Sequence, residues 1–306
     1  MFIIVLNQTN LVQDGQNNKL IYKFPNSVVL TDKYIAVSKI SMYYSWLNIS
    51  AQLGNNTFSY QYTSASSVST VVIPDGIYTT AQINAYLQFT FIQNGHYWTA
   101  NSGSTYYYPI EIVVNPTRYA IQINTFLLPT ASPWNGIVIT APPAGFAPSS
   151  QNSIITLPSA FSDLLGYRAG FVSNNNPLNA YTPSSSPSAS NNFEAKNIVG
   201  PTGTLSYLSN TSPNITPTST ILFSLSNINN PYSQPSSIIY SLSSSVLAGQ
   251  QIVDSPPNFM WNKLISGTYN ELRLSILGTN SAPIQINDPD MTILLTIRDK
   301  DEHYNK

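Results

Sequence analysis

Short runs of β-branched and aromatic residues, each closed by Asn, Asp, Gly or Pro, recur along most of this chain. Val, Ile, Thr, Tyr and Phe fit the pleated surface of a sheet, and the turn residues between the runs end each strand. The pattern predicts about ten to twelve short strands in a sandwich or barrel. The candidate segments for these strands are residues 2–6, 20–24, 34–44, 58–62, 71–73, 110–114, 119–127, 137–139, 154–157, 220–225, 237–242, 269–277 and 291–298.

Two segments have a helical pattern instead. Residues 79–93 place Ile83 and Leu87 at helical spacing, after a threonine N-cap and before Asn94-Gly95, which favours a helix end. Residues 158–166 predict a short helical turn that ends on glycine. The expected fold class is therefore all-β, a β-sandwich with one or two short helices.

Charge is scarce in this chain. Charged residues make up 8% of the sequence, against roughly 25% in an average soluble domain. Hydrophobic residues make up 42%, so the composition is not that of a disordered chain. Neutral Ser, Thr, Asn, Gln and Tyr replace the charges, and a surface of this kind does little to keep copies apart. The composition favours a subunit that assembles with copies of itself.

Several function classes lack their sequence features. There is no Lys/Arg-rich run, so we expect no nucleic-acid partner. There is no cysteine, which removes disulfides, thiolate zinc sites and cysteine nucleophiles and fits a reducing cytoplasm. No run reaches membrane-spanning length, and Met1–Leu6 is expected to be a first strand and not a signal peptide.

The chain also lacks the HExxH, GxSxG, P-loop and GxGxxG patterns of common enzymes. The two histidines are His96, expected in a loop after a helix, and His303, which lies in the charged C-terminal segment 298–306. We predict no enzyme activity, no catalytic residue, no cofactor and no metal site. A cleft that gathered carboxylates, or His96 with an acid partner, would favour a hydrolase. Between residues 40 and 253 the acids are Asp75, expected in a turn, Glu111, expected to face solvent, Asp163, expected in a helical turn, and Glu194.

Asp288-Pro-Asp290, with Asp254 upstream, is a candidate for a metal site, because carboxylates bind calcium. The segment lacks the regularly spaced oxygen ligands and the glycine of a defined calcium loop. A β-turn capped by an aspartate side chain is the prediction here.

Three parts of the sequence resemble a known family. They are the strand, turn and helix at 72–84, the helical turn at 157–167, and a C-terminal group at 229–240, 267–273 and 283–290. Together these segments resemble the minor capsid, or penton, proteins of virophages and of Polinton/Maverick elements, the mavirus-like pentons in particular.

The resemblance implies a single jelly-roll subunit, five copies of which close an icosahedral vertex. The implied partners are four further copies, in a homopentamer, and the double-jelly-roll major capsid protein. The implied location is the virion, after synthesis in the host cytoplasm. We therefore expect a jelly-roll domain from 1–127 and 218–306, with 128–217 as an insertion of outer loops, in which 153–170 could belong to either part.

A second hypothesis is a receptor- or carbohydrate-binding β-sandwich of a viral surface protein. Tyr106 to Tyr108, and the surroundings of Trp98 and Trp134, could form platforms on which sugar rings stack. Large aromatic side chains are more often buried in a core or an interface, which is the favoured interpretation of these residues.

Overall fold

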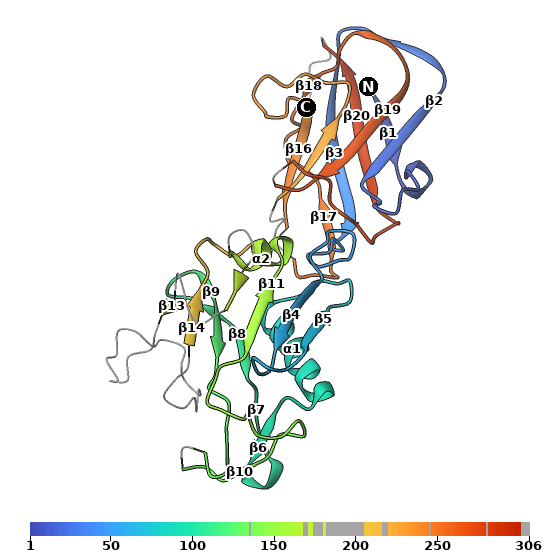
Figure 1. Cartoon of the computed structure of the whole chain (residues 1–306). Helices are drawn as coiled ribbons and strands as arrows, with labels where there is room; N and C mark the ends of the chain where they lie inside the picture. The colour runs from blue at the N-terminus through green and yellow to red at the C-terminus, as the bar shows by residue number, and fades with distance from the viewer. Residues whose placement is uncertain are drawn as a thin grey trace. The chain divides into compact units, whose positions relative to one another are not determined.

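The computed structural model describes residues 1–134, 136–167, 171–173, 180–181, 205–215, 220–244, 246–279 and 281–300. These residues contain 20 strands, two α-helices and two short 3-10 helices, which confirms the predicted all-β class. The chain forms two compact units (Figure 1). Unit 1 contains Met1–Leu47 and Thr216–Lys306, and unit 2 contains Asn48–Ile215.

Unit 1 consists of two antiparallel sheets. The first has the order β1 (Phe2–Leu6), β20 (Thr292–Asp299), β3 (Lys33–Tyr43), β17 (Gln251–Asp254), and the short β18 (Asn262–Lys263) also pairs with β3. The second has the order β16 (Ile238–Ser243), β15 (Thr220–Leu225), β19 (Gly267–Leu277), β2 (Lys19–Leu30). A 3-10 turn, η1 (Gln8–Asn10), follows β1.

The strand pairing of unit 1 is that of a jelly roll. Apart from the two-residue β18, the strands pair from the outside inward along the chain: β1 with β20, β2 with β19, β3 with β17, and β15 with β16. Four antiparallel pairs nested in this way, and divided between two sheets, define the eight-stranded jelly roll. The structure thus confirms the predicted jelly roll for unit 1.

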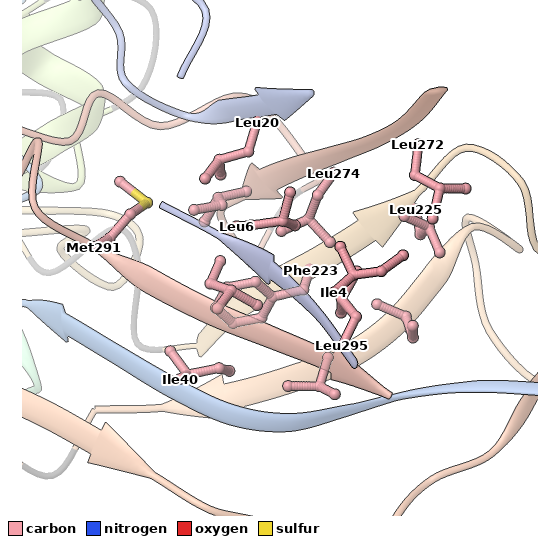
Figure 2. Packing of buried hydrophobic residues seen from close by; sticks show 14 of the residues in the cluster. Ile4, Leu6, Leu20, Ile40, Phe223, Leu225, Leu272, Leu274, Met291 and Leu295 are labelled. Atoms are coloured by element: carbon pink, nitrogen blue, oxygen red, sulfur yellow. The ribbon is translucent and has the colours of Figure 1, made fainter. Parts of the chain in front are cut away.

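Alternating residues of these strands fill one core between the two sheets. On β15 and on residues 272–277 of β19 every second residue is apolar and buried, which is the period expected for strands with one face against a core. Removal of each such leucine or isoleucine from water contributes about 1.5–3 kcal/mol. Figure 2 shows side chains from both sheets in contact across this core, among them Ile4, Leu6, Leu20, Ile40, Phe223, Leu225, Leu272, Leu274, Met291 and Leu295.

Unit 2 contains three further antiparallel sheets. One has the order β12 (Phe171–Val172), β11 (Ile154–Leu157), β4 (Thr57–Gln61), β5 (Val68–Val72). The next has the order β13 (Ala180–Tyr181), β14 (Leu205–Leu208), β9 (Ala120–Thr125), β8 (Ile110–Asn115). The smallest has the order β10 (Ile139–Thr140), β6 (Trp98–Ala100), β7 (Thr105–Tyr107), with the 3-10 turn η2 (Asn101–Gly103) between β6 and β7.

Two helices complete the core of unit 2. Helix α1 (Thr80–Asn94) begins with a capping box between Thr79 and Gln82 and ends at Gly95, whose φ of 69° is left-handed. Its buried residues Ile83, Leu87 and Phe91 recur every fourth position and face the core, as the sequence predicted. Helix α2 (Ser159–Leu165) ends at Gly166 and places Phe161 against Phe58 of β4, with ring centroids 4.7 Å apart.

All six side chains of β9 are buried, although only one face of the strand meets the apolar core. On the other face the amides of Gln122 and Asn124 form a hydrogen-bonded chain. Asn115 donates to Gln122 at 2.9 Å, Gln122 donates to Asn124 at 2.7 Å, and Asn124 donates to Glu111 at 3.2 Å. Ser206 of β14 also donates to Asn124, so this layer ties three strands together without apolar contacts.

The division into units differs from the predicted domains. The prediction joined 48–127 to the jelly roll, whereas the structure groups these residues with 128–215 around a core of their own. Leu128, Ile139 and Ala147 are buried in that core, so segment 128–152 contributes to a folded unit and is not only an outer loop. Strand periodicity shows which side chains are buried but not which strands share a core. Within the predicted insertion 128–217, residues 135, 168–170, 174–179, 182–204 and 216–217 lie outside the described residues.

No described helix combines the length and the apolar character needed to cross a membrane.

Candidate functional site

The jelly roll has one apolar outer face. It belongs to the β1–β20–β3–β17 sheet and carries Ile3, Val5, Tyr43 and Val253, whose exposed fractions are 57%, 45%, 46% and 58%. These side chains point outward because their chain neighbours, such as Ile4, Met42 and Ile252, point into the core. We call this surface the apolar face.

Small neutral residues lie between these four side chains. Ile3 is opposite Thr296 of β20, which is itself opposite Ala36 of β3, and both Thr296 and Ala36 are buried, so the face is not open to solvent across its whole width. Val253 is opposite Ser41, whose hydroxyl accepts a hydrogen bond from Gln251 at 3.1 Å. Lys39 is the charged residue in the middle of the face, and at one end the Arg298 guanidinium lies 4.2 Å from the centre of the Trp261 ring.

The outer face of the second sheet has a different character. Strands β2 and β19 carry Lys19, Lys23, Glu271 and Arg273, and the Arg273 Nε donates to Glu271 at 2.6 Å. Hydroxyls line the remaining strands, with Thr220 and Ser243 3.1 Å apart. Alternation places charge and hydroxyl groups outward here, where the first sheet places aliphatic and aromatic groups. The two faces of one sandwich therefore suit different surroundings.

The acidic candidates lie on separate elements. Asp75 accepts a hydrogen bond from the Ala51 N–H at 2.8 Å and so caps a turn. Asp163 lies in α2, as predicted. Glu111 of β8 is half-buried and accepts from Asn124, so the expectation that it faces solvent was wrong. Sequence periodicity could not reveal the amide layer that covers this side of the strand. Glu194 lies outside the described residues.

His96 lies among tyrosines directly after α1. Its ring stacks on Tyr62 with centroids 4.5 Å apart, and its Nδ1 is 2.9 Å from the Tyr60 hydroxyl. Because Asn94 donates to the Tyr60 oxygen, that hydroxyl can donate its own proton to a neutral Nδ1. Burial lowers the pKa of His96 and raises the pKa of Tyr62 to about 12. The partner of His96 is a phenol and not a carboxylate, which fits packing better than general-base chemistry. His303 lies outside the described residues.

The Asp288-Pro-Asp290 segment forms a turn. The Asp288 carboxylate accepts from the Tyr43 N–H at 2.6 Å and from the Asp290 N–H at 2.8 Å, so both oxygens are occupied by the backbone. Asp254 accepts from the Tyr240 hydroxyl at 2.6 Å. The described residues contain no group of three or more His, Asp or Glu side chains that could hold a metal ion.

The aromatic candidates divide into buried and exposed residues. Trp98 is buried and stacks on Tyr107 in the core of unit 2, and Trp134 is half-buried against the same core. Tyr106 is half-exposed on β7 and lies beside Tyr97 and Tyr108, at centroid distances of 5.6 and 6.5 Å. Only the tyrosine part of the proposed sugar platform is therefore on the surface.

The apolar face was not among the predicted sites. The signal was present in Phe2-Ile-Ile-Val-Leu6, which is apolar at every position, although a strand with one solvated face alternates. The outward residues of β3 and β17 gave no comparable signal. Tyr43 and Val253 come to lie on one surface only because β3 and β17, which are distant in sequence, pair in the sheet.

Comparisons with known proteins match this chain only at the level of structure. No family model and no curated protein matches the sequence. Among solved structures, the selenomethionine-labelled mavirus penton protein is similar over 97% of this chain and 98% of its own, with 11% identity and a TM-score of 0.36. A chain of the Sputnik virophage, from a cryo-EM structure, is similar over 96% and 97%, with 11% identity and a TM-score of 0.33.

Proposed function

We propose that this chain is a structural capsid protein of a virus, a vertex subunit that forms homopentamers and contacts the major capsid protein in the virion. The observation that supports this most is the jelly roll with one apolar and one charged outer face, since an exposed neutral sheet face suits a subunit contact. The low charge of the whole chain and the penton-like sequence segments support the same function.

Mass measurement of the purified protein tests the proposal. Light scattering on a size-exclusion column should give a species of five 33.6 kDa chains, or 168 kDa, at high protein concentration. Negative-stain images should show five-fold rings, and addition of the major capsid protein should incorporate these rings into larger particles. A monomer at every concentration would contradict the proposal. A closed ring with another number of copies would be consistent with a capsid subunit but would exclude the homopentamer.

Glycan recognition by unit 2 is the second candidate function. It is favoured by Tyr97, Tyr106 and Tyr108, which lie together on one side of the β6–β7 hairpin. A glycan array of the full chain tests it, with Tyr106→Ala compared with Tyr119→Ala, since Tyr119 is an exposed tyrosine in the β8–β9 turn. Binding that is lost only with Tyr106→Ala would support a sugar site, and an array without signal would exclude it for the glycans presented.

A further inference from the structure

We propose that the apolar face is the surface through which one copy of this chain binds a second copy. The inference rests on the proposed function, and it assigns the contact to Ile3, Val5, Tyr43 and Val253 of the jelly-roll unit.

The chemistry of the face matches that of a subunit contact. The centres of protein interfaces are depleted of charge and enriched in aromatic and apolar side chains. The apolar face carries three exposed aliphatic side chains, those of Ile3, Val5 and Val253. It also carries one tyrosine, and Lys39 is the charged residue in its middle. The opposite outer face, with Lys19, Lys23, Glu271 and Arg273, is an ordinary solvated surface.

The edge of this sheet also favours a covered surface. Within the described part of the chain, β1 pairs only with β20, so its other side is a sheet edge. Exposed edges in soluble proteins are normally blunted by lysine, proline or bulges. The corresponding edge of the second sheet follows this rule, since β2 contains Lys19, Lys23 and Pro25 and a register shift opposite Tyr269/Glu271. Strand β1 has none of these features, and its five pairs run without a register shift.

The size and neutrality of the face indicate which partner covers it. The four strands lie about 4.8 Å apart and average roughly 24 Å in length, so the whole sheet face spans about 450 Å². Thr296 and Ala36 are buried within it, so the exposed area is smaller. A stable protein contact covers about 800 Å² on each partner, so the exposed part of the face can form the centre of one such contact but not all of it. A flat area of this size fits another folded protein better than a small ligand. A second copy offers the matching neutral surface, because only 8% of its residues are charged.

A pair of valine substitutions provides a matched test. Val253→Asp places a charge on the apolar face, and Val29→Asp places the same charge on β2 of the other sheet, where valine is 68% exposed. Sedimentation velocity of each full-length variant should show that Val253→Asp weakens self-association at least tenfold, since a buried unpaired charge opposes association. Val29→Asp should remain within twofold of the unaltered protein.

The outcomes separate this inference from the proposed function. If the unaltered protein does not self-associate, the proposed function fails. If it does, and Val253→Asp associates as tightly as Val29→Asp, the protein assembles through another surface and the inference is overturned. Thermal melts of both variants control for folding. Should Val253→Asp unfold, Ile3→Asp on β1 decides the question in the same way, because it changes the same face from a different strand.

Discussion

The carboxylate of Asp288 holds together two parts of unit 1 that are far apart in sequence. It is buried, and it accepts from the N–H of Tyr43 and of Asp290, while its own N–H donates to Ser45 at 2.9 Å. Removal of a charged acceptor leaves these donors without a partner. We expect Asp288→Ala to lower the free energy of unfolding of unit 1 by about 2–3 kcal/mol, and Asp288→Asn to lower it less.

Urea unfolding of the full chain measures this loss. Asp290→Ala is the matched control, because Asp290 is an exposed aspartate in the same turn and should change stability by less than about 0.5 kcal/mol. Equal losses for Asp288→Ala and Asp290→Ala would show that the carboxylate contacts do not stabilise the turn.

The position of His96 predicts a pH dependence of stability. Burial lowers the pKa of its imidazole in the folded protein, whereas in the unfolded chain the pKa is about 6.5. Below about pH 6.5 the unfolded chain therefore binds more protons than the folded chain at this site, so stability falls as the pH falls. The loss should be complete only below the lowered folded pKa.

Melting temperatures at pH 7.5 and at pH 5 reveal the contribution of His96. We expect unit 2 to melt at a lower temperature at pH 5, and we expect His96→Gln to reduce this difference because glutamine does not titrate. A difference that is the same in both proteins would assign the pH dependence to other groups.

At the scale of elements, the end of α2 depends on the absence of a side chain at Gly166. This residue has a φ of 84°, and a Cβ there would lie 2.4 Å from the carbonyl oxygen of Thr211. Gly54 is also left-handed, at 66°, but a Cβ there would meet no atom within 4 Å. Alanine at a left-handed position costs about 1–2 kcal/mol in either case.

We therefore expect Gly166→Ala to destabilise unit 2 by at least about 2 kcal/mol more than Gly54→Ala, because backbone must move to relieve the contact. Thermal or urea unfolding of both variants measures the difference. If the two variants were equally stable, the segment at Thr211 would be able to shift without cost.

These elements show which parts of the fold local sequence can predict. Helix α1, its cap at Thr79 and its end at Gly95 were predicted closely, because capping and helical spacing involve residues a few positions apart. The β8–β9 hairpin was predicted for the same reason. The boundary between the units was not, since Trp46-Leu-Asn-Ile-Ser50 contains no Pro or Gly to mark it.

The same distinction applies to the candidate sites. Asp288 was correctly expected in a turn, because Asx capping acts over two or three residues. The hydrogen bond of Asp75 to the Ala51 N–H joins segments that are not local in sequence, and the Pro-Asp-Gly triplet did not predict it. The contact of Glu111 depends on which side chains face each other across the β8–β9 hairpin, and the apolar face depends on strands that are distant in sequence and come together only in the folded sheet. Their surroundings could not be predicted from the alternation of single strands.

At the scale of the whole molecule, unit 2 has the features of a fragment that folds alone. Its core is made entirely of its own residues, and its two ends are linked, since the Asn48 side chain donates to the Ile215 carbonyl at 2.7 Å. The same amide group donates to the Tyr78 carbonyl and accepts from the Tyr78 N–H. We expect a protein of residues 48–215 to be folded in isolation.

A cooperative thermal transition and dispersed amide NMR signals from this fragment would confirm the prediction. Asn48→Ala in the fragment should lower its melting temperature, because it removes the hydrogen bond to Ile215 at the other end and the two hydrogen bonds to Tyr78. A fragment without a cooperative transition would show that unit 2 needs the rest of the chain in order to fold.

The linked ends of unit 2 have an evolutionary consequence. The unit lies within one connection of the jelly roll, between β3 and β15. None of the four nested strand pairs contains a strand from unit 2. Changes of length or sequence within 48–215 therefore leave the pairing of the jelly roll unaltered, as is general for insertions whose ends lie close together. Selection can diversify or even exchange this module among lineages while it conserves the jelly roll that carries it.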